Sequence, residues 1–217
     1  MYSIEALLIV SAAASVGLVS LIGVLVFYVS ESRLKKWMPS LIAVAVGVLL
    51  GDAFLHLIPD AIQRAPGSES GVALWVLIGI ISFVFLESGL QWRHDHELKS
   101  PHEGEDDIAS FAKMNLVGDG AHNFVDGVLI TASFLADPAL GVATTVAIVL
   151  HEIPQEISDV AVLIQGGFSR RKAVLLNFCC ATACLVGAIS TLLFSHVMEL
   201  NIAAMLAFTA GGFIYIA

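Results

Sequence analysis

Two short polar blocks interrupt two long apolar stretches of this sequence, and their side chains are of the types that bind divalent metals. The first block runs from His122 to Asp126 and the second from His151 to Glu156. Imidazole nitrogens and carboxylate oxygens are ligands that zinc and related metals accept. Ionisable side chains at bilayer depth are costly and usually mark a functional site. The pattern therefore predicts metal binding inside a membrane protein.

Helical spacing places the members of each block on shared faces. His122 and Asp126 are four residues apart, as are His151 and Gln155, while Glu152 begins the adjoining row of its helix. With a rise of 1.5 Å per residue, the two blocks lie about 14–22 Å from the cytosolic ends of their helices. We therefore predict that two antiparallel helices form one site near the middle of the bilayer.

The amino-acid composition is that of an integral membrane protein. The chain has 217 residues, of which 58% are hydrophobic and only 13% charged, and its mean hydropathy is +0.89. A soluble domain needs far more surface charge, and a membrane span needs about 20 mainly apolar residues. We predict an all-α, polytopic membrane helical bundle as a single domain over residues 1–217. Its seven helices are expected at 4–30, 39–60, 71–92, 113–136, 139–166, 172–196 and 201–217. The last run is short and stops while still apolar, so the chain is expected to be truncated.

Basic residues predict the orientation. Nine of the ten lie in the connections that follow the first, third and fifth predicted helices. The positive-inside rule places that side in the cytosol and the N-terminus outside, in a plasma (inner) membrane. The longest connection, 93–112, is then a cytosolic loop rich in acids. It holds His94, His96 and His102, which either capture metal weakly or belong to a solvated linker.

Acidic residues inside the apolar segments are too numerous for a purely structural role. There are six of them: Asp52, Asp119, Asp126, Glu152, Glu156 and Asp159. At about 2.5–3.5 kcal/mol each, their insertion costs on the order of 15–20 kcal/mol, more than the stability margin of about 5–15 kcal/mol. The segment interiors contain almost no Lys or Arg to pair with them. A hydrated cavity that binds cations resolves the conflict.

The helix predicted at 39–60 contributes Asp52 and His56, four residues apart and toward its outer end. This pair is either an outer ligand or gate for the metal, or a polar contact between helices. Asp119, Glu156 and Asp159 are likewise assigned to a gate or to proton-linked steps. The same helix carries Gly47 and Gly51, whose small-xxx-small spacing favours close packing of another helix.

Other partners and chemistries find little support. No basic patch suggests nucleic acid, and no catalytic cofactor is indicated. The three cysteines fall within one predicted helix, where a disulfide framework is implausible. The expected partners are divalent metal ions and the lipid bilayer, and a homodimer is left open.

In three blocks the chain resembles the ZIP family of divalent metal transporters, and a bacterial member of it. The blocks are Gly118–Gly127, His151–Asp159 and Asp52–Pro59. The resemblance implies an eight-helix fold with both termini outside and metal uptake toward the cytosol. It also implies a first metal site made of His122, Asp126, His151 and Gln155. His56 is a possible further ligand, and Asn123 and Glu152 match a second, adjacent site.

Gln155 is where this chain departs from the family pattern, because many members have His and others Glu at that position. A neutral amide is a poorer ligand, so we expect one well-formed site. The predicted function is transport of a divalent metal, Zn²⁺ first and otherwise Fe²⁺, Mn²⁺ or Cd²⁺, and not an enzymatic activity. One alternative is an intramembrane zinc hydrolase with Glu152 as base, although Gln155 breaks the His-Glu-x-x-His signature. Another alternative is a proton or cation channel.

Overall fold

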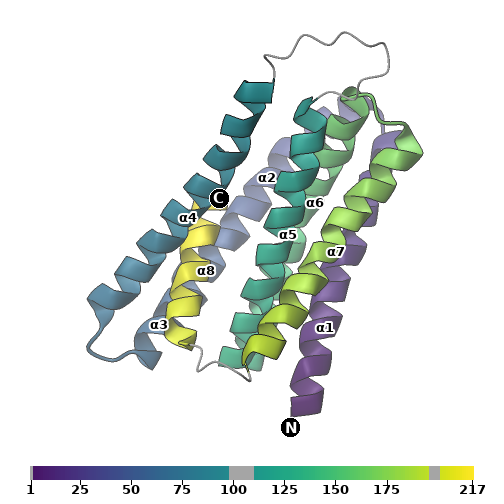
Figure 1. The fold of residues 1–217 in the computed structure, drawn as a ribbon. Coiled ribbons are helices and arrows are strands. Elements are labelled where there is room, and N and C mark those ends of the chain that lie inside the picture. The colour runs from purple at the N-terminus through teal and green to yellow at the C-terminus, as the bar shows by residue number, and fades with distance from the viewer. Residues whose placement is uncertain (1, 98–109, 196–200) are drawn as a thin grey trace.

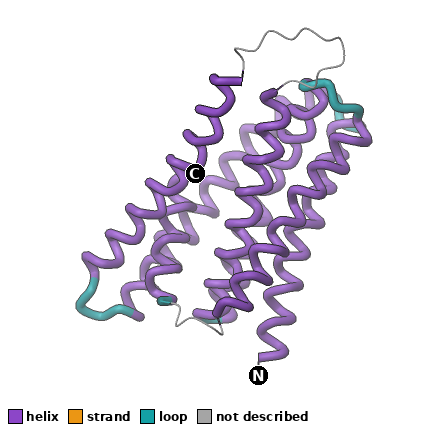
Figure 2. Tube along the Cα trace, in the orientation of Figure 1, coloured by secondary structure: helices purple, strands orange, loops and turns teal. Residues whose placement is uncertain are grey.

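The structure is a computed structural model that describes residues 2–97, 110–195 and 201–217. These residues form long helices packed side by side in one bundle, and no strand occurs among them (Figures 1 and 2). The predicted all-α helical bundle is confirmed.

The helices mostly extend beyond their predicted limits. Their bounds are α1 Tyr2–Val19, continued by the 3₁₀ segment η1 Ser20–Phe27; α2 Glu31–Asp52, continued by the π segment η2 Ala53–Leu57 and by α3 Ile58–Arg64; α4 Glu69–Glu97; α5 Ser110–Ala136; α6 Pro138–Gln165; α7 Arg170–Ser195; and α8 Ile202–Ile216. The prediction started the second helix eight residues late and ended the third five residues early. Apolar runs mark only the part of a helix that lies in lipid, whereas backbone hydrogen bonds continue into the polar residues on either side.

Within the described ranges, three helical stretches are long and apolar enough to cross a membrane: Ile4–Phe27, Lys36–Arg64 and Arg170–Ser195. Two shorter apolar helices cover Glu69–Phe85 and Ile202–Ile216. Helices α5 and α6 have sufficient length, but their polar blocks lower their apolar character. Many large apolar side chains lie exposed on the bundle surface, among them Leu7, Phe85 and Leu193. Such a surface suits lipid, and the chain is a multi-pass membrane protein.

The helices pack as two groups that meet chiefly along α2 and α6. Helices α1, α5, α6 and α7 form one group, and α2–α3, α4 and α8 form the other. In Figure 1, α4 and α8 lie side by side at one edge of the bundle and α1 and α7 at the opposite edge. The connections α1–α2 and α6–α7 lie at one end, near Lys36 and Arg170, which we call the basic end.

Glycines set the closest helix contacts, but not at the positions that the sequence suggested. A Cβ atom on Gly127 of α5 would overlap the carbonyl oxygen of Cys184 on α7, and one on Gly187 would overlap that of Phe124. By contrast, a Cβ on Gly47 or Gly51 would meet nothing within 4 Å. The spacing at Gly47 and Gly51 permits close packing, but no helix among the described residues packs closely there. Small spacing permits close approach, but neighbouring side chains decide whether it occurs.

A tight turn holds α5 and α6 antiparallel. Asp137 has an extended backbone (φ −160°), and its Oδ1 atom accepts hydrogen bonds from the backbone N–H groups of Ala139 (2.8 Å) and Leu140 (3.2 Å). Pro138 occupies the first helical position, where a missing N–H costs nothing. This N-cap fixes the start of α6 and therefore the depth at which its polar block faces α5.

The π segment η2 is a feature that the sequence analysis did not foresee. Its bonding pattern shows in the N–H of Ile58, which donates to the carbonyl of Ala53 five residues earlier. Pro59 follows and has no N–H to donate, so the helical ladder changes register just before it. Single π turns are often found at functional sites, and this one carries His56.

Candidate metal centre

Four side chains from α5 and α6 converge at one point. They are His122, Asp126, His151 and Glu152, which we call the His–acid quartet, and one ligand atom from each lies within 4.8 Å of all the others. The Nε2 atoms of the two histidines are 3.1 Å apart. The Nε2 atom of His122 lies 3.6 Å from Oδ2 of Asp126 and 3.6 Å from Oε1 of Glu152. The Nε2 atom of His151 lies 3.7 Å and 3.4 Å from the same two oxygens.

The carboxylates of the quartet lack partners. Asp126 and Glu152 are 0% exposed, and none of their four oxygens has a hydrogen-bond partner. Their separations from the imidazoles exceed the usual hydrogen-bond length. Within the described ranges, neither acid pairs with Lys or Arg. Burying a charge without a partner is strongly unfavourable, so the centre is built for a cation.

The spacing of the ligand atoms fits a tetrahedral metal ion. Zinc bonds imidazole nitrogen and carboxylate oxygen at about 2.1 Å, which places tetrahedral ligands about 3.4 Å apart. The five separations given above run from 3.1 to 3.7 Å. Two nitrogens and two carboxylate oxygens also suit other first-row divalent ions. The quartet can therefore hold a divalent metal without rearrangement of its backbone.

Surrounding residues orient the imidazole of His151. Its Nδ1 atom lies 3.3 Å from the carbonyl oxygen of Ala147, which leaves Nε2 directed at the quartet. The ring of Phe213, from α8, packs against it with centroids 6.4 Å apart. The side chain of His122 is 15% exposed, whereas that of His151 is 3% exposed. The quartet is thus walled by apolar groups and slightly open at His122.

A cavity of about 230 Å³ lies between α2 and α6, and both His151 and Gln155 line it. Its wall on α2 is apolar and reaches Met38, near the basic end. Gln155 is therefore placed beside the quartet, on the side of the basic end. The Gln155 amide, at a position where the sequence predicted a ligand, thus lines the same cavity as His151.

His56 lies apart from the quartet. Its Nδ1 atom is 3.0 Å from Oδ1 of Asp52, and Thr144 of α6 donates to Oδ2 of the same carboxylate at 2.9 Å. The side chain of His56 is 53% exposed and lines a second pocket of about 300 Å³ at the end of the bundle opposite the basic end, together with Asp60 and Asp137. Sequence reasoning missed Thr144, although it lies seven residues before His151 on the same helical face.

Between the quartet and the basic end, amide side chains donate hydrogen bonds to a second set of carboxylates. The Nδ2 atom of Asn123 donates to Oδ1 of Asp119 at 2.8 Å, and Asn115 donates to Oδ1 of Asp159 at 3.0 Å. Asn177 of α7 donates to the carboxylate of Glu156. We call Asp119, Glu156, Asp159 and Asn177 the amide–acid cluster.

Two expectations from the sequence, one based on the family resemblance and one on the loop histidines, look different in three dimensions. The resemblance grouped Asn123 with Glu152 in an adjacent site, but the structure brings the Glu152 carboxylate to the two imidazoles and ties Asn123 to Asp119. Among the histidines predicted in the loop, His94 and His96 belong to α4, which runs to Glu97. His102 lies outside the described residues.

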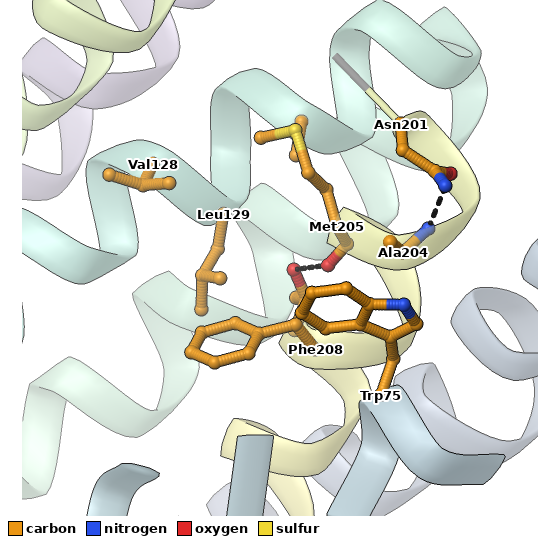
Figure 3. Close-up of a pocket in the computed structure, with 9 residues that line it drawn as sticks. Trp75, Val128, Leu129, Asn201, Ala204, Met205 and Phe208 are labelled. Carbon is orange, nitrogen blue, oxygen red and sulfur yellow. Dashed lines mark hydrogen bonds between the residues drawn. The ribbon is translucent and has the colours of Figure 1, made fainter. Parts of the chain in front are cut away.

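Another pocket, of about 260 Å³, lies between α4, α5 and α8 and is distinct from the metal centre (Figure 3). Trp75, Leu129 and Phe208 give it an apolar lining. Its polar groups are satisfied locally: Asn201 accepts from the backbone N–H of Ala204 at 3.0 Å, and Thr209 donates to the carbonyl of Met205 at 2.8 Å. None of its lining residues is His, Cys, Asp or Glu, so it is not a metal site.

The fold and the site together define a bundle of long apolar helices around a buried centre of imidazoles and carboxylates. The family model described as ZIP Zinc transporter matches residues 6–110 and 93–217 of the chain. The chain belongs to this family, which is one of transporters and not of enzymes.

Curated relatives agree with this assignment. The chain is 37% identical over 202 residues to "Zinc transporter ZIP13" of Pongo abelii, an alignment that covers 86% of this chain and 58% of the relative. It is 33% identical to "Zinc transporter zipt-7.2" of Caenorhabditis elegans, over 100% of this chain and 57% of the relative. It is 31% identical to "Zinc transporter SLC39A7" of Homo sapiens, over 87% of this chain and 58% of the relative. The chain thus spans under three fifths of the length of these relatives.

Proposed function

We propose that this protein carries a divalent metal ion, zinc in the first place, across a membrane, with the His–acid quartet as its binding site in transit. The observation that carries the proposal is the set of four buried, unpartnered carboxylate oxygens of Asp126 and Glu152 beside two imidazole nitrogens. A cation satisfies all of them together. The relatives named zinc transporters support zinc as the first ion to test.

The two cavities on either side of the quartet suggest a route. The outer pocket, with His56 and Asp60, offers polar groups that attract a cation, and the inner cavity leads from His151 toward the basic end. Between the outer pocket and His151, α6 presents Ala147 and Ile148, both 0% exposed. Access in this conformation is therefore from the basic end.

The family resemblance implies uptake toward the cytosol, and the basic residues supply the orientation. Eight of the nine described Lys and Arg residues lie toward the basic end, which the positive-inside rule assigns to the cytosol of a plasma membrane, with the N-terminus outside. Uptake then runs from the outer pocket to the inner cavity. Asp52 contacts the imidazole of His56 at the outer pocket, and in this proposal the pair acts as a gate.

The two alternatives from the sequence have less support. A channel needs a continuous wet path, whereas buried Ala147 and Ile148 lie between the two cavities described here. A hydrolase needs a base free to act on water. Glu152, the expected base, is instead a member of the quartet and is fully buried.

Zinc flux into proteoliposomes tests the proposal. The full chain is reconstituted with a zinc-sensitive dye inside, and initial rates are measured against external zinc. We expect saturable flux that His151→Ala abolishes. His56→Ala, which removes an imidazole from the outer pocket, should slow the flux without abolishing it. Flux that never saturates, equal flux in His151→Ala, or zinc binding without any flux would overturn the proposal.

A further inference from the structure

The amide–acid cluster contains buried oxygens that nothing in the protein satisfies. One oxygen of each carboxylate in the cluster has no partner, and neither does the amide oxygen of Asn177. Asp119 is 5% exposed, while Glu156 and Asn177 are 0% exposed. An unmet buried acceptor costs about 1–3 kcal/mol, and a charged one more. The carboxylates of Asp119 and Glu156 and the amide oxygen of Asn177, from three different helices, thus each have an oxygen that a cation could satisfy.

The cluster adjoins the quartet on the side of the basic end. Glu156 lies four residues beyond Glu152 on α6, so it is about 6 Å nearer the basic end. Gly23 of η1 lets that segment approach α6 there: a Cβ on Gly23 would lie 3.0 Å from the carbonyl oxygen of Glu156. The segment closes the cluster on one side, while Asn177 closes it from α7.

No counter-charge from the protein balances the cluster. In the part of the chain that the structure describes, none of its carboxylates forms an ion pair with Lys or Arg, whereas Arg64 pairs with Asp60 at the other end of the bundle. Cys180, beside Asp119 on α7, donates its thiol to the carbonyl of Leu116 at 3.3 Å. The groups that remain for an ion are therefore oxygens only.

Oxygen donors select hard cations, whereas imidazole nitrogens favour zinc and related metals. The spacing narrows the choice further. Among the described residues only the quartet gathers three or more His, Cys, Asp or Glu side chains closely enough to hold a metal ion directly, so the three acids of the cluster do not close on one bare ion. Mg²⁺ suits such an arrangement because it gives up its waters reluctantly and usually keeps several of them when bound.

We propose that the amide–acid cluster binds a hydrated hard divalent cation of the Mg²⁺ type, at a site separate from the quartet. Glu156 and Asp119 supply charge, and the amide oxygen of Asn177 receives a hydrogen bond from a metal-bound water or binds the ion directly. The inference goes beyond the proposed function, because it adds a second ion that need not travel with the first.

Pulsed electron paramagnetic resonance of Mn²⁺ tests the proposal, since Mn²⁺ replaces Mg²⁺ at oxygen sites. The full chain in phosphatidylcholine nanodiscs is first saturated with zinc to fill the quartet and is then titrated with Mn²⁺. We expect one bound Mn²⁺ without coupling to imidazole nitrogen, displaced by excess Mg²⁺. Glu156→Gln and Asp119→Asn should each weaken Mn²⁺ binding at least about tenfold.

Controls keep the outcome interpretable. Glu69→Gln makes the same chemical change on an exposed residue of α4 and should leave Mn²⁺ binding unchanged. Zinc binding measured on every sample reports an intact fold. Imidazole coupling to the bound Mn²⁺, unchanged Mn²⁺ affinity in both cluster variants, or absence of Mn²⁺ binding in wild type that still binds zinc would overturn the inference. None of these results touches zinc binding by the quartet, so the two proposals fail separately.

Discussion

The His–acid quartet and the amide–acid cluster share two helices and lie about one helical turn apart, yet their acids are arranged for different ions. In the quartet, two imidazoles stand between the carboxylates and all four ligand atoms fall within 4.8 Å. In the cluster, amides of Asn123, Asn115 and Asn177 each take one carboxylate oxygen and leave the other free. Neither region pairs its acids with Lys or Arg among the described residues, so the neutral neighbours of each acid set what it can bind.

The largest expected effect comes from removing an imidazole. His122→Ala or His151→Ala should weaken zinc binding at least about 100-fold, because each removes one of four ligands and leaves the acids uncompensated. Isothermal titration calorimetry on purified protein measures this directly. Mn²⁺ binding at the amide–acid cluster should be unchanged in the same variants.

The matched control is His56→Ala, which removes an imidazole that belongs to neither region and should keep zinc affinity within about twofold of wild type. Unchanged zinc affinity in both quartet variants would show that the site is assigned to the wrong residues. Loss of both zinc and Mn²⁺ binding in one variant would instead indicate that the two regions form a single site.

A second test compares the two glutamates of α6. Glu152→Gln removes a buried charge without partners and should stabilise the metal-free protein by about 1–3 kcal/mol. Glu156→Gln should stabilise it less, because Asn177 already bonds that carboxylate. Thermal unfolding with and without chelator measures both. We further expect zinc to raise the stability of Glu156→Gln but not of Glu152→Gln. Destabilisation of the metal-free protein by Glu152→Gln would mean that its carboxylate has a partner other than metal.

Sequence reasoning went furthest where helical periodicity applies. Spacing of four residues identified His122 with Asp126, and apolar runs located the helices. Periodicity does not show how far each helix is rotated about its own axis relative to its neighbour. That rotation brings Glu152, from the adjoining row of α6, to the two imidazoles. The separation of His56 from the quartet depends in turn on how the outer end of α2 packs against α6, where Asp52 meets Thr144, and periodicity does not give this packing.

Single polar residues on otherwise apolar helices were the main omission. Asn177 on α7 has no charged partner at helical spacing, and Thr144 on α6 shares a face only with the more distant His151, so in the sequence either could be an isolated side chain satisfied by its own backbone. Their roles are visible only once Glu156 and Asp52 are found beside them. These roles depend on tertiary contacts between helices, which cannot be predicted from the spacing of residues in a single sequence.

Gln155 offers a way to sharpen the quartet. It lies one turn from His151 and lines the same cavity, so Gln155→His places a zinc ligand on the path toward the basic end. We expect zinc affinity to rise about tenfold, or about 1.4 kcal/mol, and zinc release into proteoliposomes to slow. Gln155→Leu, which removes the amide and adds no ligand, is the control. Equal affinity in wild type and Gln155→His would place this side chain outside reach of the ion.

The smallest effect concerns pH and follows from the difference in ligand type. Imidazole is the side chain whose ordinary pKa lies nearest neutrality, and a metal ligand must be deprotonated to bind. Two of the four quartet ligands are imidazoles, so zinc affinity should fall as the pH is lowered from 7.5 to 6. Mn²⁺ affinity at the all-oxygen cluster should fall less over the same range. Titrations of both ions in one buffer series measure the contrast. An equal fall for both ions would indicate that the cluster ion also depends on histidine, and the division between the two regions would not hold.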